Sequence, residues 1–189
     1  MYRKTRRTQT GLTLIELIVF IVIVSVGLAG ILLTYDTVVR SSADPMVRKQ
    51  ALAIAESVLL EIEQQPFTWC DPQDENVTTA TSATECATNN QSNLGGPTPT
   101  TETRGSAADP FDNVADYANY NSATASNIDG TSTLAGYTVS VAVTDAGGVA
   151  PFGAIPAGAM LRIAVTVVGR GETVTLVGYR ARYAPNAAG

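Results

Sequence analysis

One apolar run near the N-terminus constrains this chain more than any other feature. Leu12 to Leu33 is 22 residues long, with Glu16 as its only charged residue. At about 1.5 Å of rise per residue, a helix of this length spans ~33 Å, close to the ~30 Å hydrocarbon core of a bilayer. A buried core helix or strand rarely needs such length. We therefore expect a membrane-spanning helix.

The residues around this run predict its orientation and compartment. Residues 1–11 contain no acid and four basic residues: Arg3, Lys4, Arg6 and Arg7. A basic flank before the first hydrophobic segment stays in the cytoplasm, so the rest of the chain is expected outside it. Cys70 and Cys86 agree with this placement, because an even pair of cysteines in an exported domain usually forms a disulfide.

Composition excludes several function classes. Without residues 1–11 the chain would carry 8 basic and 17 acidic residues, so nucleic acid is not an expected partner. The chain has no histidine, which removes the commonest general base and the commonest zinc ligand. No phosphate-binding loop or hydrolase motif is present, and we expect neither an enzyme nor a cofactor.

Glu16 needs an explanation, because an ionisable group inside a membrane helix costs roughly 3 kcal/mol near the bilayer centre and less near an end. The carboxylate can reach the near interface, or it can pair with a cation at its own depth. The sequence offers such a cation only if the chain is cut after Gly11. The new ammonium group of Leu12 then lies one helical turn from Glu16, or within reach of the Glu16 of a neighbouring copy.

The stretch "RRTQTG" followed by "LTLIELIVFIVIV" resembles the class III signal of type IV pilins and type II secretion pseudopilins. This resemblance implies cleavage by prepilin peptidase after Gly11, N-methylation of Leu12, and pairing of Glu16 with the N-terminal amine of an adjacent subunit. The family more often has phenylalanine after the cut, so leucine is a departure. The alternatives are a secretory signal, which would have a shorter apolar region, and a plain membrane anchor, which leaves the coincidence of Gly11, Leu12 and Glu16 unexplained.

Five segments are expected: a cleaved leader (1–11), a membrane and assembly helix (12–35), an amphipathic helix (36–66), a loop-rich region (67–135) and an antiparallel β-meander (136–184). The amphipathic helix is predicted from one apolar stripe with helical spacing. Its members are Val47, Ala51, Ala55, Val58 and Ile62. Asp44 and Pro45 either cap the start of this helix or kink one longer helix.

The loop-rich region has no periodicity, and we expect the disulfide to hold it. Within it, Asp109, Asp112 and Asp116 are candidate calcium ligands, a property that some pseudopilins have. Their spacing is not that of an EF-hand, and we favour a solvated acidic turn without a metal.

From residue 136 the pattern changes to a period of two, which predicts three antiparallel strands. Gly169 to Glu172 is expected to form a turn, and Val177-Gly178 a bulge in the last strand. The apolar face of these strands needs a cover, and the stripe of the 46–64 helix is available. The predicted fold is α+β and pilin-like, with a long N-terminal helix packed on a C-terminal antiparallel sheet.

Three further stretches are similar to D-type minor pilins of mannose-sensitive haemagglutinin (MSHA) pilus systems: "SADPMVRKQALAIAESVLLEI", "QPFTWCDPQDEN" and "FDNVADY". This similarity implies a low-abundance subunit of an adhesive filament. Its partners would be other pilins, prepilin peptidase and the inner-membrane assembly machinery. It implies an inner-membrane precursor with its head in the periplasm, and later a place in a surface pilus. A minor pseudopilin of type II secretion and a membrane-anchored glycan-binding or protein-binding module stay as alternatives.

Overall fold

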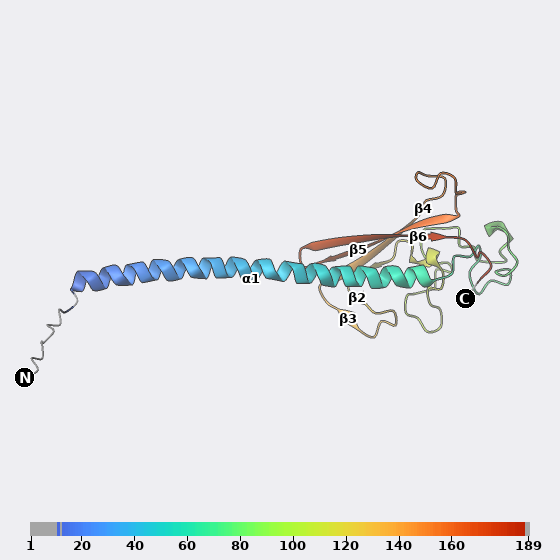
Figure 1. Cartoon of the computed structure of the whole chain (residues 1–189). Helices are drawn as coiled ribbons and strands as arrows, with labels where there is room; N and C mark the ends of the chain where they lie inside the picture. Colours follow the sequence, from blue (N-terminus) through green and yellow to red (C-terminus); the bar gives the residue numbers. More distant parts are fainter. Residues whose placement is uncertain (1–10, 12, 188–189) are drawn as a thin grey trace, which may run out of the picture. The chain divides into compact units, whose positions relative to one another are not determined.

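The computed structural model describes residues 11 and 13–187, except for the side chains of residues 37 and 39–44. The leader residues 1–10 and Leu12 therefore lie outside the described part. The chain divides into two units, Met1–Pro45 and Met46–Gly189. Helix α1 (Leu14–Gln64) contributes residues to both units (Figure 1).

The first unit contains the apolar half of α1. Leu14–Asp36 is a stretch of 23 residues that is long and apolar enough to cross a membrane, and its apolar window contains no buried residue. Two hydroxyl groups in this half donate back to the helix: Ser25 Oγ to Ile21 O at 2.7 Å and Thr34 Oγ1 to Gly30 O at 2.9 Å. These two hydroxyl groups are thus satisfied inside the helix, as a hydrocarbon environment requires.

Pro45 lies inside α1. Of the two interpretations of Asp44-Pro45, the structure has the proline within one helix and not at the start of a second. The helix ends at Gln64, two residues before Pro66. This end agrees with the sequence, because the residue before a proline is disfavoured in the helical region.

The second unit, called the head below, contains an antiparallel sheet in the order β1-β4-β5-β6. The bounds of its strands are β1 (Asn121–Ser122), β4 (Tyr137–Asp145), β5 (Met160–Gly169) and β6 (Glu172–Ala181). A separate short hairpin pairs β2 (Ala125–Ser126) with β3 (Thr133–Leu134). The predicted α+β class with a long N-terminal helix is confirmed.

The bulge expected at Val177-Gly178 is wrong. The pairing of β5 with β6 runs without interruption from Met160 opposite Ala181 to Gly169 opposite Glu172. Gly178 is instead explained by the neighbouring helix. A Cβ atom at this position would lie 2.2 Å from Glu63 Oε1 and 2.9 Å from Leu59 Cδ1, so a side chain here would displace the ends of two side chains of α1.

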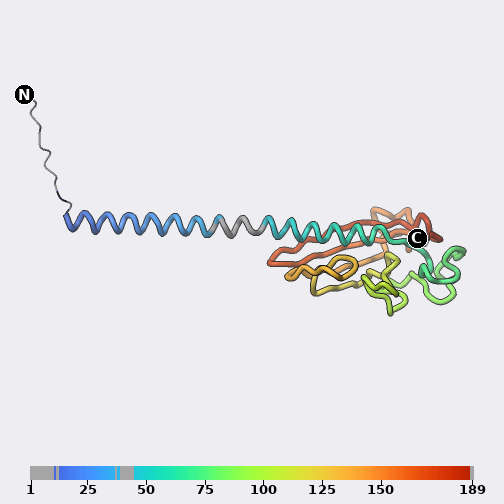
Figure 2. The backbone as a smooth tube through the Cα atoms, turned by 90° about the horizontal axis from the view of Figure 1, so that it is seen from below, coloured from blue at the N-terminus to red at the C-terminus, as the bar shows by residue number. Residues whose placement is uncertain are grey.

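The main core lies between the last third of α1 and the sheet, which lie side by side in Figures 1 and 2. The four stripe residues Ala51, Ala55, Val58 and Ile62 are at most 2% exposed, and Val47 packs against the same core. They belong to one core with eight buried residues of β4 and β5, which are Tyr137, Val139, Val141, Val143, Leu161, Ile163, Val165 and Val167. The stripe predicted from helical spacing is therefore the surface that the helix buries.

Candidate functional site

The start of α1 is set by Thr13. Its Oγ1 accepts a hydrogen bond from the Glu16 N–H at 3.4 Å, and its carbonyl accepts one from the Leu17 N–H at 3.2 Å. A threonine three residues before a glutamate is the spacing of a capping box, and the N-terminal end of a helix favours a negative side chain. Glu16 therefore lies in the first turn as an exposed carboxylate on an exposed apolar surface. Gly11, three residues before the first residue of α1, is exposed.

The disulfide predicted between Cys70 and Cys86 is confirmed. The two Cα atoms are 5.4 Å apart and the cysteines are separated by 16 positions in the chain. Closing a loop of this length stabilises the folded state by ~3 kcal/mol on the chain-entropy model. The bond thus holds the first part of the region that the sequence predicts to be loops.

Asp74 binds the backbone of Ala87 to Asn89, the segment that follows Cys86 of the disulfide. The sequence analysis did not predict this role. Its Oδ1 accepts from the N–H groups of Asn76 at 2.9 Å and Ala87 at 3.0 Å. Its Oδ2 accepts from the N–H groups of Thr88 at 2.8 Å and Asn89 at 3.1 Å. Burial opposes ionisation, but these four bonds outweigh it and lower the pKa of Asp74. The available signal was the Asp-x-Asn spacing, which is typical of a side chain bonded to a nearby turn.

The three acidic residues predicted as candidate calcium ligands have different environments. Asp116 is fully buried in the short helix η2 (Val114–Tyr117), whose capping box it forms with Asn113. Its Oδ2 accepts from the Asn113 N–H at 2.7 Å, and its Oδ1 accepts from the Thr98 N–H at 3.2 Å. The expectation of a solvated turn is therefore wrong for Asp116, since backbone N–H groups replace water around it. Asp109 and Asp112 are half-buried.

Glu61, on α1, forms the buried ion pair that joins the helix to the loop region. Arg104 donates to Glu61 through Nε at 2.8 Å and through Nη2 at 2.6 Å, a two-pronged contact. The Tyr117 hydroxyl donates to the same carboxylate at 2.8 Å. Arg104 Nη1 also donates to Ser126 O at 3.2 Å, which brings the β2-β3 hairpin into the contact. Glu61 lies off the apolar stripe, and sequence spacing alone does not indicate its partners.

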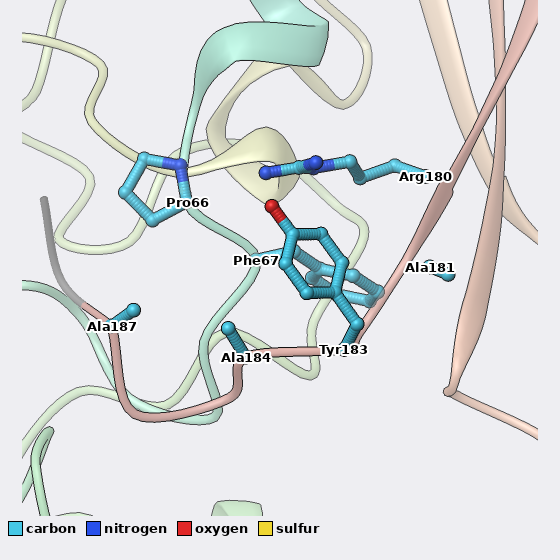
Figure 3. A pocket seen from close by; sticks show the side chains of 7 residues that line it. All are labelled: Pro66, Phe67, Arg180, Ala181, Tyr183, Ala184 and Ala187. Carbon is cyan, nitrogen blue, oxygen red and sulfur yellow. The ribbon is translucent and has the colours of Figure 1, made fainter.

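A small pocket lies between the end of α1 and the C-terminal segment of the head (Figure 3). Its lining consists of Pro66, Phe67, Arg180, Ala181, Tyr183, Ala184 and Ala187. The Arg180 guanidinium lies 5.2 Å from the centre of the Tyr183 ring and donates to Gln65 O at 3.0 Å, so it is held by contacts within the protein. These seven residues include no carboxylate, histidine or thiol and therefore offer no acid, base or nucleophile pair.

Comparison with known proteins identifies one feature. The model of the prokaryotic N-terminal methylation motif matches residues 6–32. No curated protein and no solved structure matches the chain. The matched segment contains Gly11, Glu16 and the exposed apolar helix, and it supports a type IV prepilin-like protein. The match covers only the start of the chain, residues 6–32 of 189, and leaves the head without a known relative.

Proposed function

We propose that this chain is a minor pilin of a type IV-like, MSHA-type pilus. The observation that carries the proposal is the methylation motif over residues 6–32, with Glu16 in the first turn of an apolar helix that has no buried residue in its membrane-length window. Prepilin peptidase cuts after Gly11 at the cytoplasmic face, and Leu12 becomes the N-methylated terminus. The head lies in the periplasm until the subunit leaves the inner membrane for the filament.

The role of Glu16 follows from the physics of helices in lipid. Two apolar helices gain little by burying area against each other there, because the lipid tails are equally apolar. A pair between the Glu16 carboxylate and the N-terminal amine of an adjacent subunit supplies a preferred register that apolar packing does not. No catalytic group is needed for this role.

The MSHA-type assignment rests on the three similar sequence stretches, which cover the second half of α1 and two of the head loops. Two alternatives share the architecture. A minor pseudopilin of type II secretion would affect protein release and not piliation when it is lost. A binding module would require its head to recognise a glycan or another protein.

The first experiment is mass spectrometry of the N-terminal peptide, from sheared surface filaments and from membranes in parallel. The proposal predicts a peptide that begins at N-methylated Leu12 in the filament fraction. Retention of residues 1–11 together with confinement to membranes would contradict it and leave an ordinary membrane anchor. Deletion of the gene, scored for pili and for secreted proteins, separates the pilus from the secretion machine.

Substitution of Glu16 tests the assembly contact. The variants Glu16→Ala and Glu16→Gln should insert into the membrane as the wild type does, because both remove a charge from an apolar helix. Their content in sheared filaments should fall about tenfold or more, since the adjacent amine loses its partner. Ser25→Ala is the matched control, because the Ser25 hydroxyl bonds only within its own helix at Ile21 O. Normal incorporation of Glu16→Gln would show that the charge pair is not needed.

A further inference from the structure

Three carboxylates from separate loops meet inside the head. Asp71 follows Cys70 of the disulfide, Glu102 lies in the loop before Arg104, and Asp112 precedes η2. One oxygen of each lies within 4.8 Å of the others. Asp71 is 1% exposed and Glu102 is 2% exposed, while Asp112 is half-buried. Such a group costs free energy unless something compensates its charge.

Protein hydrogen bonds compensate only part of this acidic group. Gln73 donates to Asp71 Oδ1 through its N–H at 2.8 Å, and to Asp112 Oδ2 through its side-chain amide. Within the described part of the chain, neither oxygen of Glu102 has a hydrogen-bond partner, and neither does Asp112 Oδ1. Asp112 Oδ1 and both Glu102 oxygens are therefore buried acceptors without a donor.

Gln91 adds a fourth oxygen of a different kind. This side chain is 1% exposed, and its amide nitrogen donates to Thr98 O at 2.8 Å and to Asp71 Oδ2 at 3.4 Å. These contacts fix the amide beside the acidic group and leave Gln91 Oε1 buried without a hydrogen-bond partner among the described residues. The Gln91 amide thus lies next to Asp71, and its unpartnered oxygen is a fourth candidate ligand, also an oxygen.

The nearest arginine in the sequence does not neutralise the group. Arg104 is two residues from Glu102, yet its guanidinium pairs with Glu61. Among the described residues, no lysine or arginine forms an ion pair with Asp71, Glu102 or Asp112, so this acidic group has no cation of its own.

We propose that Asp71, Glu102, Asp112 and Gln91 form a binding site for a calcium ion. Calcium takes six to eight oxygen ligands and accepts carboxylates and amide carbonyls in irregular arrangements. Magnesium requires near-octahedral geometry and keeps several waters, which suits a set of loop-borne side chains less well. A calcium ion would give the unpartnered oxygens their missing partner and join the disulfide loop to the segments around Glu102 and Asp112. The site does not depend on the pilin proposal.

Calcium binding is tested by calorimetric titration of the full chain in detergent micelles. The protein is first treated with EDTA, then exchanged into chelator-free buffer and titrated with CaCl₂ or MgCl₂. We expect one calcium per chain, with a dissociation constant of about 10⁻⁴–10⁻³ M, as is usual for extracellular calcium modules. Absence of calcium binding at millimolar concentration overturns the proposal, and binding of magnesium alone overturns the choice of calcium.

Two variants then locate the ion. Glu102→Gln keeps the size and one oxygen of the side chain but removes its charge, and it should weaken calcium binding about tenfold or more. Glu75→Gln, at an exposed acidic residue in the same loop region, is the matched control and should bind as the wild type does. Equal binding by the wild type and Glu102→Gln would place the ion elsewhere.

Thermal unfolding, followed by the fluorescence of the single tryptophan, Trp69, gives a readout that is independent of heats of binding. Calcium should raise the unfolding temperature of the wild type and of Glu75→Gln, but should leave that of Glu102→Gln almost unchanged. In EDTA, Glu102→Gln should unfold at the wild-type temperature or above it, because its neutral amide places no carboxyl group beside Asp71 and Asp112. This second result shows that the variant is folded, so that a lost calcium response is a property of the site.

Discussion

Single buried polar residues hold the loops of the head in place through hydrogen bonds. Asp74 and Asp116 are buried acidic residues, and each accepts backbone N–H groups from segments far along the chain. Asn113 is also buried; it donates to Thr68 Oγ1 at 2.8 Å and accepts from the Ala115 N–H at 3.1 Å. These side chains satisfy the backbone of loops that have no regular pairing of their own.

Asp74 should therefore contribute to stability. The variant Asp74→Asn replaces one accepting oxygen by an amide group that faces N–H donors, and we expect the free energy of unfolding to fall by about 2 kcal/mol. Denaturant unfolding of the full chain in micelles, followed by Trp69 fluorescence, measures this change. Asp129→Asn is the control, because the Asp129 carboxylate is exposed and bonds only within its own turn, to Thr131.

The effect of Asp74 should also depend on pH. The folded-state pKa lies below the usual value, so the stabilisation is present above the unfolded pKa of about 3.9 and disappears as the pH falls through the folded value. The difference in stability between wild type and Asp74→Asn should thus be largest near neutral pH and shrink below about pH 4. A difference that stays constant down to acid pH would mean that the ionised form is not the one the N–H groups favour.

The roles of single residues were harder to predict from the sequence than the helices and strands. Cys70 and Cys86 were paired correctly, because only two cysteines exist and the compartment could be inferred. Glu102 and Gln91 gave no signal, since each is one polar residue in a polar region. Apolar periodicity detects which face of an element is buried, but a buried polar side chain depends on partners that are distant in sequence.

At the scale of elements, the turn between β5 and β6 depends on tight packing. Arg170 and Gly171 are its central residues, with φ of 52° and 89°, the combination of a two-residue hairpin turn. Gly169, at the end of β5, is packed against β4. A Cβ atom there would lie 2.3 Å from Tyr137 Cδ1 and 2.7 Å from Gly136 O. Tyr137 has no room to move, because it is 1% exposed and its hydroxyl donates to Gln50 Oε1 at 2.6 Å.

Gly169→Ala should destabilise the head by about 2 kcal/mol, because the added methyl group displaces either a backbone carbonyl or a buried ring. Gly153→Ala is the matched control: no atom lies within 4 Å of a Cβ placed at that position, and its φ is not positive. Urea unfolding of the full chain in micelles compares the two variants. Equal stability of both would show that the strand end relaxes without cost.

Elements with a clear period were predicted well, and the others were not. The strands β4, β5 and β6 lie where alternation of apolar and polar residues placed them, and α1 buries its predicted stripe. The strands β1, β2 and β3 have two residues each, too few to show a period. Gly178 was taken for a bulge because a glycine in a strand has two explanations, and only the position of α1 distinguishes them.

At the scale of the whole head, the Glu61–Arg104 pair connects α1 to the loops. Both side chains are nearly buried, with exposures of 11% and 6%. Arg104→Met leaves the Glu61 charge buried without its cation and should lower the free energy of unfolding by about 3 kcal/mol. Arg48→Met, on the exposed face of the same helix, should change it little. The double variant Glu61→Leu/Arg104→Met should recover part of the lost free energy of unfolding, because it removes both charges together. A loss equal to the sum of the losses of the two single variants would show that the charges act independently.

The exposed sides of the Leu14–Asp36 stretch have a consequence for how the protein can travel. Each side of that stretch is a surface which water hydrates poorly, so this part of the chain cannot pass through an aqueous stage on its own. If the helix leaves the bilayer, it must pass directly from the lipid to the apolar surface of another protein. For the proposed pilin role, departure from the membrane and binding to other subunits are then a single event, and a subunit without a binding partner stays in the membrane.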